Sequence, residues 1–254
     1  DRHHTMECYT RTKELIAKNQ DETDTCVLNY DDEETRSFGE RVKASVLYFC
    51  REHILDQGVF LDGTAIVYCD DAIRTKICDV SELKLLGVHN YENVMAAIAI
   101  GAAMGVPLPN IRRTVVNFTA VEHRIEFVAE KRGVAYYNDS KGTNTDASIK
   151  AVQAMNRPTI LIGGGYDKHV SFDDWIESFG DKVKWLVLLG QTAGQIAETA
   201  RRHGFTNLVF AESLEEAVRI CEEKAQAGDA VLLSPACASW GMFDNYEQRG
   251  NLFK

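Results

Sequence analysis

The second half of the chain alternates short, continuous apolar runs with amphipathic segments. Apolar runs of this length predict strands, and apolar residues that recur every three or four positions predict helices. The predicted strands cover residues 126–138, 159–164, 184–190, 207–211 and 230–234. The predicted helices between them cover residues 146–155, 173–179, 193–203 and 214–227. Continuous apolar strands that alternate with helices indicate a mostly parallel sheet covered on both faces, so we expect a Rossmann-like α/β domain.

The first half of the chain has a less regular pattern. A helix is predicted over residues 6–19, with Tyr9 and Lys13 on one face at a spacing of four. The run TCVLNYDD predicts a buried strand that ends in two carboxylates, and several short strands are predicted between residues 40 and 86. Further helices are predicted from about residue 90 to Gly105 and over residues 110–117. The change of pattern predicts two domains, 1–120 and 121–254.

Composition excludes several classes of protein. At 254 residues and 45% hydrophobic content, the chain can form two modest domains, each with a core. The net charge of −10 argues against a nucleic-acid surface, where a basic stripe is expected. No segment has the length of a membrane helix, and the charged opening lacks the apolar centre of a signal peptide. We therefore expect a cytoplasmic protein without nucleic-acid or membrane partners.

The cysteines suggest neither a zinc site nor a disulfide framework. Their number is odd and no two form a C-x-x-C pair. The seven cysteines lie at positions 8, 26, 50, 69, 78, 221 and 237. We expect free thiols in a reducing compartment.

Candidate chemistry gathers in the loops that follow the predicted strands of the second half. In a parallel sheet, ligands bind beyond the carboxyl ends of the strands. Lys141, in the loop NDSKGTN, opposes the positive end of the following helix dipole, which favours a bound anion beside it. Lys168 follows three glycines in GGGYDKH and can meet a carboxylate or phosphate. Both loops are also compatible with ordinary solvated turns in which polar side chains cap free amides.

Two other segments carry candidate residues. SPACASWGMFDNYEQRG, residues 234–250, is a long predicted loop, and loops of this length are usually functional or disordered. Its aromatic residues argue against disorder, and its Cys237 is either a nucleophile or a buried inert thiol. In EHRIE, Arg124 could bind a phosphate or form an ion pair at a hinge.

Five segments, in order and spacing, resemble the second half of the Mur ligases. They are GVHNYENVMAAIAIGAAMGVP, EHRIE, YYNDSKGTNTDAS, GGGYDK and LLSPACASWGMFDNYEQRG. Within that family, NDSKGTN and SPACASWGMF are most similar to the members that add D-glutamate. The chain departs from the family at Gly142, which is usually Ala, and at Tyr246, which is usually Phe.

The resemblance implies an ATP-dependent ligase of cytoplasmic peptidoglycan synthesis. ATP and Mg²⁺ would be the cofactors, and UDP-N-acetylmuramoyl-L-alanine and D-glutamate the substrates. ATP would phosphorylate the alanyl carboxylate, and the amine of D-glutamate would attack the resulting acyl phosphate. Charge on the transferring phosphoryl group needs a metal ion and positioned cations.

The family's functional residues map onto this sequence position by position. The resemblance implies nucleotide contacts by Asn90, Asn93, Arg124 and Asp139. It implies D-glutamate contacts by Thr143, Lys168, Ser239 and the backbone of Tyr246. Lys141 would lie close to the incoming carboxylate as a catalytic cation. Lys13 matches a catalytic lysine that becomes carbamylated and then helps to position Mg²⁺, a reaction that burial or nearby cations would favour.

The same comparison predicts an incomplete central domain before the second domain. The family's phosphate loop, of the form G-x-x-G-K-[ST], its Mg²⁺-binding Glu and His and its UDP-binding domain all precede Asp1 and Arg2 of this sequence. We therefore expect an upstream portion to be missing, the fragment to lack ligase activity, and its truncated domain to self-associate through open sheet edges.

Two alternatives belong to other classes. An independent α/β nucleotide-binding module or dehydrogenase would require a G-x-G-x-x-G turn, which the sequence lacks. A non-catalytic protein could bind amino acids or partners with the same loops.

Overall fold

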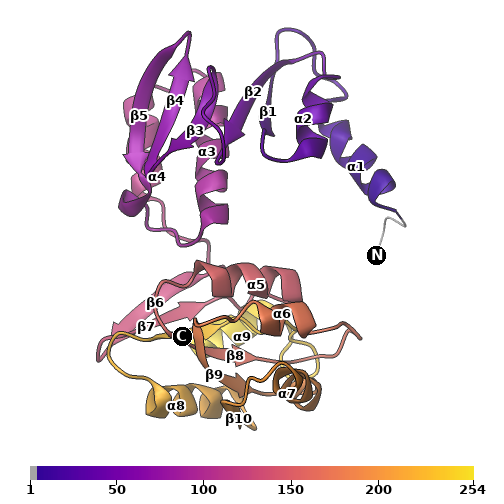
Figure 1. Cartoon of the computed structure of the whole chain (residues 1–254), viewed down its shortest axis with the longest axis vertical. Coiled ribbons are helices and arrows are strands. Elements are labelled where there is room, and N and C mark those ends of the chain that lie inside the picture. The colour runs from indigo at the N-terminus through magenta and orange to yellow at the C-terminus, as the bar shows by residue number, and fades with distance from the viewer. Residues whose placement is uncertain (1–4) are drawn as a thin grey trace. The chain divides into compact units, whose positions relative to one another are not determined.

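The computed structural model describes residues 5–254, so the Asp-Arg-His-His opening lies outside the described residues. The chain divides into two compact units, Asp1–Phe118 and Thr119–Lys254, each with its own sheet (Figure 1). No helix within residues 5–254 is long and apolar enough to cross a membrane.

The first unit contains a five-stranded sheet. Its strands, in spatial order, are β1 (Thr25–Asn29), β2 (Ser45–Cys50), β3 (Gly58–Asp62), β4 (Ala65–Asp70) and β5 (Ile73–Asp79). The first three are parallel and the last two pair antiparallel. The unit's helices are α1 (Met6–Glu14), α2 (Glu33–Gly39), α3 (Val88–Ala103) and α4 (Leu108–Asn117), with short 3₁₀ turns at Leu15–Ala17 and Val80–Glu82. β1 lies at the sheet edge, and self-association through that edge stays a prediction.

Two helices of this unit follow the sequence pattern closely. α1 is shorter than the predicted 6–19, because its last residues tighten into a 3₁₀ turn, and Thr5 caps its amino end. The Lys13 Nζ atom lies 5.3 Å from the centre of the Tyr9 ring, so the predicted shared face is confirmed. α3 begins at Val88, slightly before the predicted start, and the chain leaves it through Gly105 at φ +74°. Its Met95, Ile98 and Ala99 are fully buried.

The second unit is the predicted Rossmann-like α/β domain. Its sheet runs in the order β10-β9-β8-β11-β7-β6, and all its strands are parallel except β6. The strands are β6 (Glu126–Lys131), β7 (Val134–Asn138), β8 (Thr159–Gly163), β9 (Val183–Leu188), β10 (Leu208–Phe210) and β11 (Ala230–Leu233). The helices are α5 (Thr145–Ala154), α6 (Asp173–Glu177), α7 (Ala193–Arg202), α8 (Leu214–Lys224) and α9 (Tyr246–Phe253).

Two sequence predictions were wrong in this unit. Residues 126–138 form a hairpin of two antiparallel strands, because Arg132 and Gly133 adopt φ +55° and +76° and reverse the chain. The segment predicted as a long loop ends in α9, which Asn245 starts by accepting a hydrogen bond from the Gln248 amide at 2.7 Å. α9 had no strong helical periodicity to reveal it.

Close packing in the centre of this sheet leaves little freedom at β8. Every residue of β8 and of β11 is buried. Gly163 lies under the fully buried indole of Trp175, where an added Cβ atom would meet the ring at 2.6 Å. The small residue at the end of β8 therefore lets α6 pack onto the sheet.

We expect Gly163→Ala to destabilise the protein by about 1–3 kcal/mol, because the rigid Trp175 ring and the backbone must separate. The matched control is Gly194→Ala in α7, where an added Cβ meets nothing within 4 Å. This control should stabilise by up to about 1 kcal/mol, since Ala is the better helix former. Urea unfolding of both variants measures the change in the free energy of unfolding. Equal changes in the two variants would contradict the packing argument.

Candidate functional site

Several of the polar residues predicted from sequence lie in the loops that follow β7, β8 and β11. The turn after β7 begins with Asn138, which is completely buried. Its Nδ2 atom donates to His123 Nδ1 at 3.0 Å and contacts Glu126 Oε2 and the Gly250 carbonyl at 3.2 Å each. Its Oδ1 atom accepts the Ser140 amide at 3.1 Å. Asn138 thus fixes the start of the turn to His123, the residue before Arg124, and to Gly250 of α9.

Asp139 follows and points into the protein. One carboxylate oxygen accepts the Ser234 hydroxyl at 2.7 Å, and the other accepts the Ile125 amide at 3.2 Å. Ser148 completes this group, because its hydroxyl lies 2.9 Å from that of Ser234. Burial raises the pKa of Asp139 to about 7, although these hydrogen bonds and the charges of Arg124 and Arg249 oppose the rise.

Gly142 allows the inward position of this carboxylate. A Cβ atom at residue 142 would meet Asp139 Oδ2 at 2.4 Å and the Ser234 hydroxyl at 2.9 Å. The departure from the usual alanine at this position therefore has a structural consequence, since Asp139 occupies the space that a methyl group would take.

Arg249 of α9 joins the turn to the loop after β11. Its side chain is buried, with Nε donating to the Ser140 hydroxyl at 2.9 Å and Nη2 to the Ser140 carbonyl at 2.7 Å. Nη1 donates to the Cys237 carbonyl at 3.1 Å. Ser140 in turn donates to the Tyr246 carbonyl at 2.8 Å. Sequence reasoning missed Ser140, Ser234 and Arg249, although all three lie inside the segments that carried the resemblance.

The two candidate lysines of the second unit, Lys141 and Lys168, each lie over an aromatic ring. The Lys141 Nζ atom is 5.1 Å from the centre of the Tyr246 ring, and Lys168 Nζ is 5.6 Å from that of Trp240. Lys168 also donates to the Thr143 carbonyl at 3.3 Å. The structure thus brings Lys141 close to Tyr246, and Lys168 close to Thr143.

Ser239, the remaining candidate in the loop after β11, is buried beside Gly164 and Gly165 of the loop after β8. A short antiparallel bridge between Tyr166 and Ala238 holds the two loops together. Cys237 precedes Ala238 of this bridge and lies 3.3 Å from the Thr192 hydroxyl, and burial raises the pKa of its thiol. The structure therefore favours the inert thiol over the nucleophile.

The His-Arg step has strained backbone. His123 and Ile125, on either side of Arg124, have φ values of +65° and +45°. Residues other than glycine seldom adopt positive φ, and the β-branched Ile125 does so least readily. Glu122 and Glu126 pair with Lys254, so the hinge ion pair considered for Arg124 is not the one that forms. The Arg124 guanidinium is exposed and makes no ion pair with a described residue.

Three sequence candidates belong to the first unit. Asn90 and Asn93 lie one turn apart on α3, where Asn93 Nδ2 donates to Asn90 Oδ1 at 3.3 Å. Asn90 also donates to the Leu86 carbonyl at 2.7 Å. Lys13 is exposed on α1, so the burial that would favour its carbamylation is absent from the described structure.

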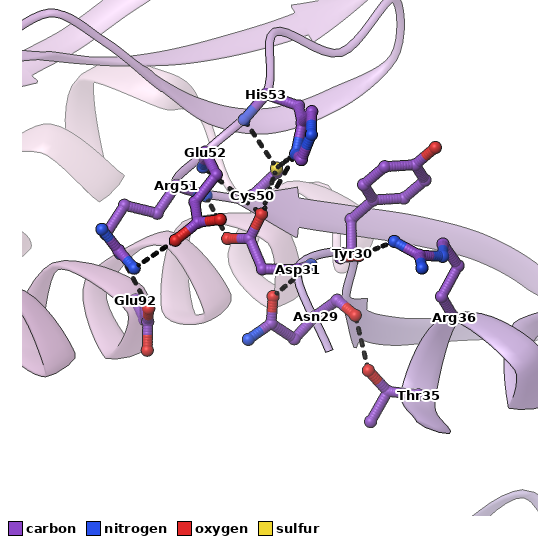
Figure 2. A network of polar contacts seen from close by, with 10 residues as sticks. All are labelled: Asn29, Tyr30, Asp31, Thr35, Arg36, Cys50, Arg51, Glu52, His53 and Glu92. Carbon is purple, nitrogen blue, oxygen red and sulfur yellow. Dashed lines mark hydrogen bonds and ion pairs between the residues drawn. The ribbon is translucent and has the colours of Figure 1, made fainter. Parts of the chain in front are cut away.

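A further polar cluster in the first unit was not expected (Figure 2). Asp31, Cys50 and His53 place a carboxylate oxygen, a sulfur and a ring nitrogen within 4.8 Å of one another. Burial raises the pKa of the Cys50 thiol to about 11, which makes it a poor nucleophile without a ligand. A search for C-x-x-H spacing would have found Cys50 and His53, but Asp31 comes from another strand end.

The buried Asp139 predicts a pH dependence of stability. Its native pKa near 7 exceeds the ordinary carboxyl value of 3.8, so its stabilising contribution is full below about pH 4 and is lost as the pH rises through 7. We expect Asp139→Asn to become more stable relative to the parent chain between pH 5 and pH 8, by at most about 3 kcal/mol. Thermal unfolding at both pH values measures the difference. The exposed Asp181→Asn should show no such trend, and parallel pH curves for Asp139→Asn would refute the assignment.

Two family models match the chain. The Mur ligase middle domain matches residues 1–101, and the Mur ligase glutamate ligase domain matches residues 123–237. The UDP-N-acetylmuramoylalanine–D-glutamate ligases of Lachnoclostridium phytofermentans and Lachnospira eligens are each 56% identical over 254 residues. Those 254 residues are 100% of this chain and 56% of each relative, so the chain spans little more than half their length.

Solved structures show the same fold at low identity. UDP-N-acetylmuramate-alanine ligase from Thermotoga maritima has a TM-score of 0.70 at 17% identity, over 98% of this chain and 54% of that one. MurF ligase from the same organism, solved in complex with ADP, has a TM-score of 0.61 at 16% identity, over 90% and 54%. The two family models and the 56% identical relatives show that the chain belongs to the Mur ligase family.

Proposed function

We propose that this chain is part of an ATP-dependent ligase that adds D-glutamate to UDP-N-acetylmuramoyl-L-alanine in cytoplasmic peptidoglycan synthesis. The observation that carries the proposal is the pair of lysines, Lys141 and Lys168, at the carboxyl edge of the second sheet. Both lie over aromatic rings of the segment 234–250, Lys141 over Tyr246 and Lys168 over Trp240, and Lys168 also donates to the Thr143 carbonyl. The names of the 56% identical relatives support the same reaction.

D-glutamate carries two carboxylates, and the second unit offers cations suited to them. Lys168 is exposed and its present partner is a neutral carbonyl, so an entering carboxylate would gain a charge-assisted hydrogen bond. Thr143, Ser239 and the backbone of Tyr246 would complete the contacts to the amino acid. Lys141, half-buried over Tyr246, would face the carboxyl group that becomes the acyl phosphate and stabilise its developing charge.

The donor set also suits a nucleotide. Arg124 presents an exposed guanidinium with no ion-pair partner among the described residues, as a phosphate contact requires. Asp139 would accept hydrogen bonds from ribose hydroxyls only after it turned out from its buried position against Ser234. In the first unit, Asn90 and Asn93 offer amide groups to an adenine. Mg²⁺ would supply charge neutralisation at the transferring phosphoryl group, and Lys13 could help to hold it only as its carbamate.

The 254-residue chain by itself should not catalyse the reaction. It contains no G-x-x-G-K-[ST] segment, and that loop supplies most of the backbone amides that cradle phosphates in such enzymes. We expect no phosphate release above background when the purified chain receives ATP, Mg²⁺, D-glutamate and UDP-N-acetylmuramoyl-L-alanine. Steady release that Arg124→Ala abolishes would refute this expectation.

Binding of D-glutamate should nevertheless be measurable. We expect Lys168→Ala to weaken it about tenfold or more, since the carboxylate loses a charged hydrogen-bond donor. The matched control is Lys150→Ala, which removes an exposed lysine of α5. An NMR titration of the whole chain with D-glutamate measures both affinities. Absence of shifts in the loops around residues 143, 168 and 239 in the parent chain would refute the proposed substrate.

A further inference from the structure

The ends of two neighbouring parallel strands create a compact set of metal-binding atoms in the first unit. β1 and β2 pair in parallel, with Asn29 beside Phe49 at their carboxyl ends. Asp31 follows β1 by two residues, Cys50 is the last residue of β2, and His53 lies three residues further on. Figure 2 shows the three side chains converging on one point. The sheet itself thus brings these groups together.

The distances among the three atoms fit one tetrahedral ion. Cys50 Sγ lies 3.6 Å from His53 Nδ1, and His53 Nδ1 lies 3.4 Å from Asp31 Oδ1. Zinc bonds of about 2.3 Å to sulfur and about 2.0–2.2 Å to nitrogen or oxygen place such ligand atoms about 3.3–3.6 Å apart. Only the Cys50 to Asp31 distance, 2.9 Å, is shorter, because the thiol donates a hydrogen bond to the carboxylate. Loss of that proton would let the two atoms separate.

Backbone amides already support two of the three groups. The His53 amide donates to Cys50 Sγ at 3.1 Å, an interaction that stabilises a thiolate. The amides of Arg51 and Glu52 donate to Asp31 at 2.6 and 3.3 Å. Because these bonds fix the sulfur and the carboxylate before any ion arrives, binding would require little rearrangement beyond the His53 ring.

The site has a closed side and an open side. Cys50 is fully buried and the Asp31 side chain is 11% exposed, whereas the His53 side chain is 59% exposed. An ion held by the three would therefore keep a fourth position towards solvent, where water can bind.

We propose that Asp31, Cys50 and His53 bind a zinc ion, with water as the fourth ligand. On binding, a Zn–S bond forms and the Cys50 thiol releases its proton to solvent. The sulfur and nitrogen donors select zinc over Mg²⁺, which prefers oxygen ligands. This site is therefore separate from the magnesium chemistry of the proposed ligase.

The neighbouring contacts indicate what the ion would stabilise. Arg51, between two of the ligands, donates to Glu92 Oε1 of α3 at 3.1 Å. Glu92 lies between Asn90 and Asn93 on the same helix. A zinc ion would hold the ends of β1 and β2 together and fix the loop that contacts the start of α3.

The test uses the whole chain, stripped of metal and kept reduced, and titrated with ZnCl₂ by calorimetry and with CoCl₂ by absorption. We expect one zinc ion per chain, and a thiolate-to-cobalt charge-transfer band that Cys50→Ser removes. His53→Gln changes an exposed side chain, so it should fold normally and bind zinc at least about tenfold more weakly.

Two control variants separate this site from adventitious binding. His169→Gln alters an exposed histidine of the second unit that lies 3.3 Å from Asp167, and Cys69→Ser alters a buried cysteine of the first unit. Both should bind zinc like the parent chain. Failure of the parent chain to bind zinc at micromolar concentration would overturn the proposal, as would binding that His53→Gln leaves unchanged.

Discussion

The candidate site of the second unit depends on the hydrogen bonds that the buried guanidinium of Arg249 donates. Burial lowers its pKa to about 10, a sign of how costly the charge is in this position. The chain satisfies it with the Ser140 hydroxyl, the Ser140 carbonyl and the Cys237 carbonyl. Because these acceptors lie on the turn after β7 and the loop after β11, a satisfied Arg249 requires both loops and α9 to be in place together.

Around this fixed centre, the groups that could meet ligands are left accessible. Asn138, Ser140 and Ser234 are completely buried, and their side chains form hydrogen bonds with other groups of the protein. Lys168 and Arg124, by contrast, remain at the surface, and Lys168 contacts only a neutral carbonyl and the Trp240 ring. The arrangement holds exposed cations beside a buried, fully hydrogen-bonded turn, so an anion could bind without rearrangement of that turn.

In the first unit, a carboxylate instead of a cation connects two strand ends through hydrogen bonds. Asp31 accepts the amides of the loop after β2, and so closes the end of the sheet next to α3. The same geometry exposes the imidazole of His53 while it buries the Cys50 sulfur. A cluster that stabilises a loop in the metal-free protein is therefore also suited to holding an ion.

Local sequence was enough to predict most of the fold. The alternation of apolar strands and amphipathic helices predicted the second sheet, because period and length are properties of each segment alone. The spacing of Tyr9 and Lys13 likewise placed them on one face, as the cation–π contact confirms. Local signals failed at the hairpin turn of Arg132 and Gly133, hidden inside an apolar run, and at α9, whose apolar pattern is weak.

The sequence by itself determined the class of fold, the family resemblance and the loops where candidate residues lie. Tertiary structure alone decided that Asp139 is buried against Ser234, that Arg249 meets Ser140, and that Asp31 lies beside Cys50. In the first two pairs the partners are separated by 95 and 109 residues, and no local period connects them. Such contacts depend on which strands become neighbours in the sheet, and strand order follows from packing the whole domain around one core.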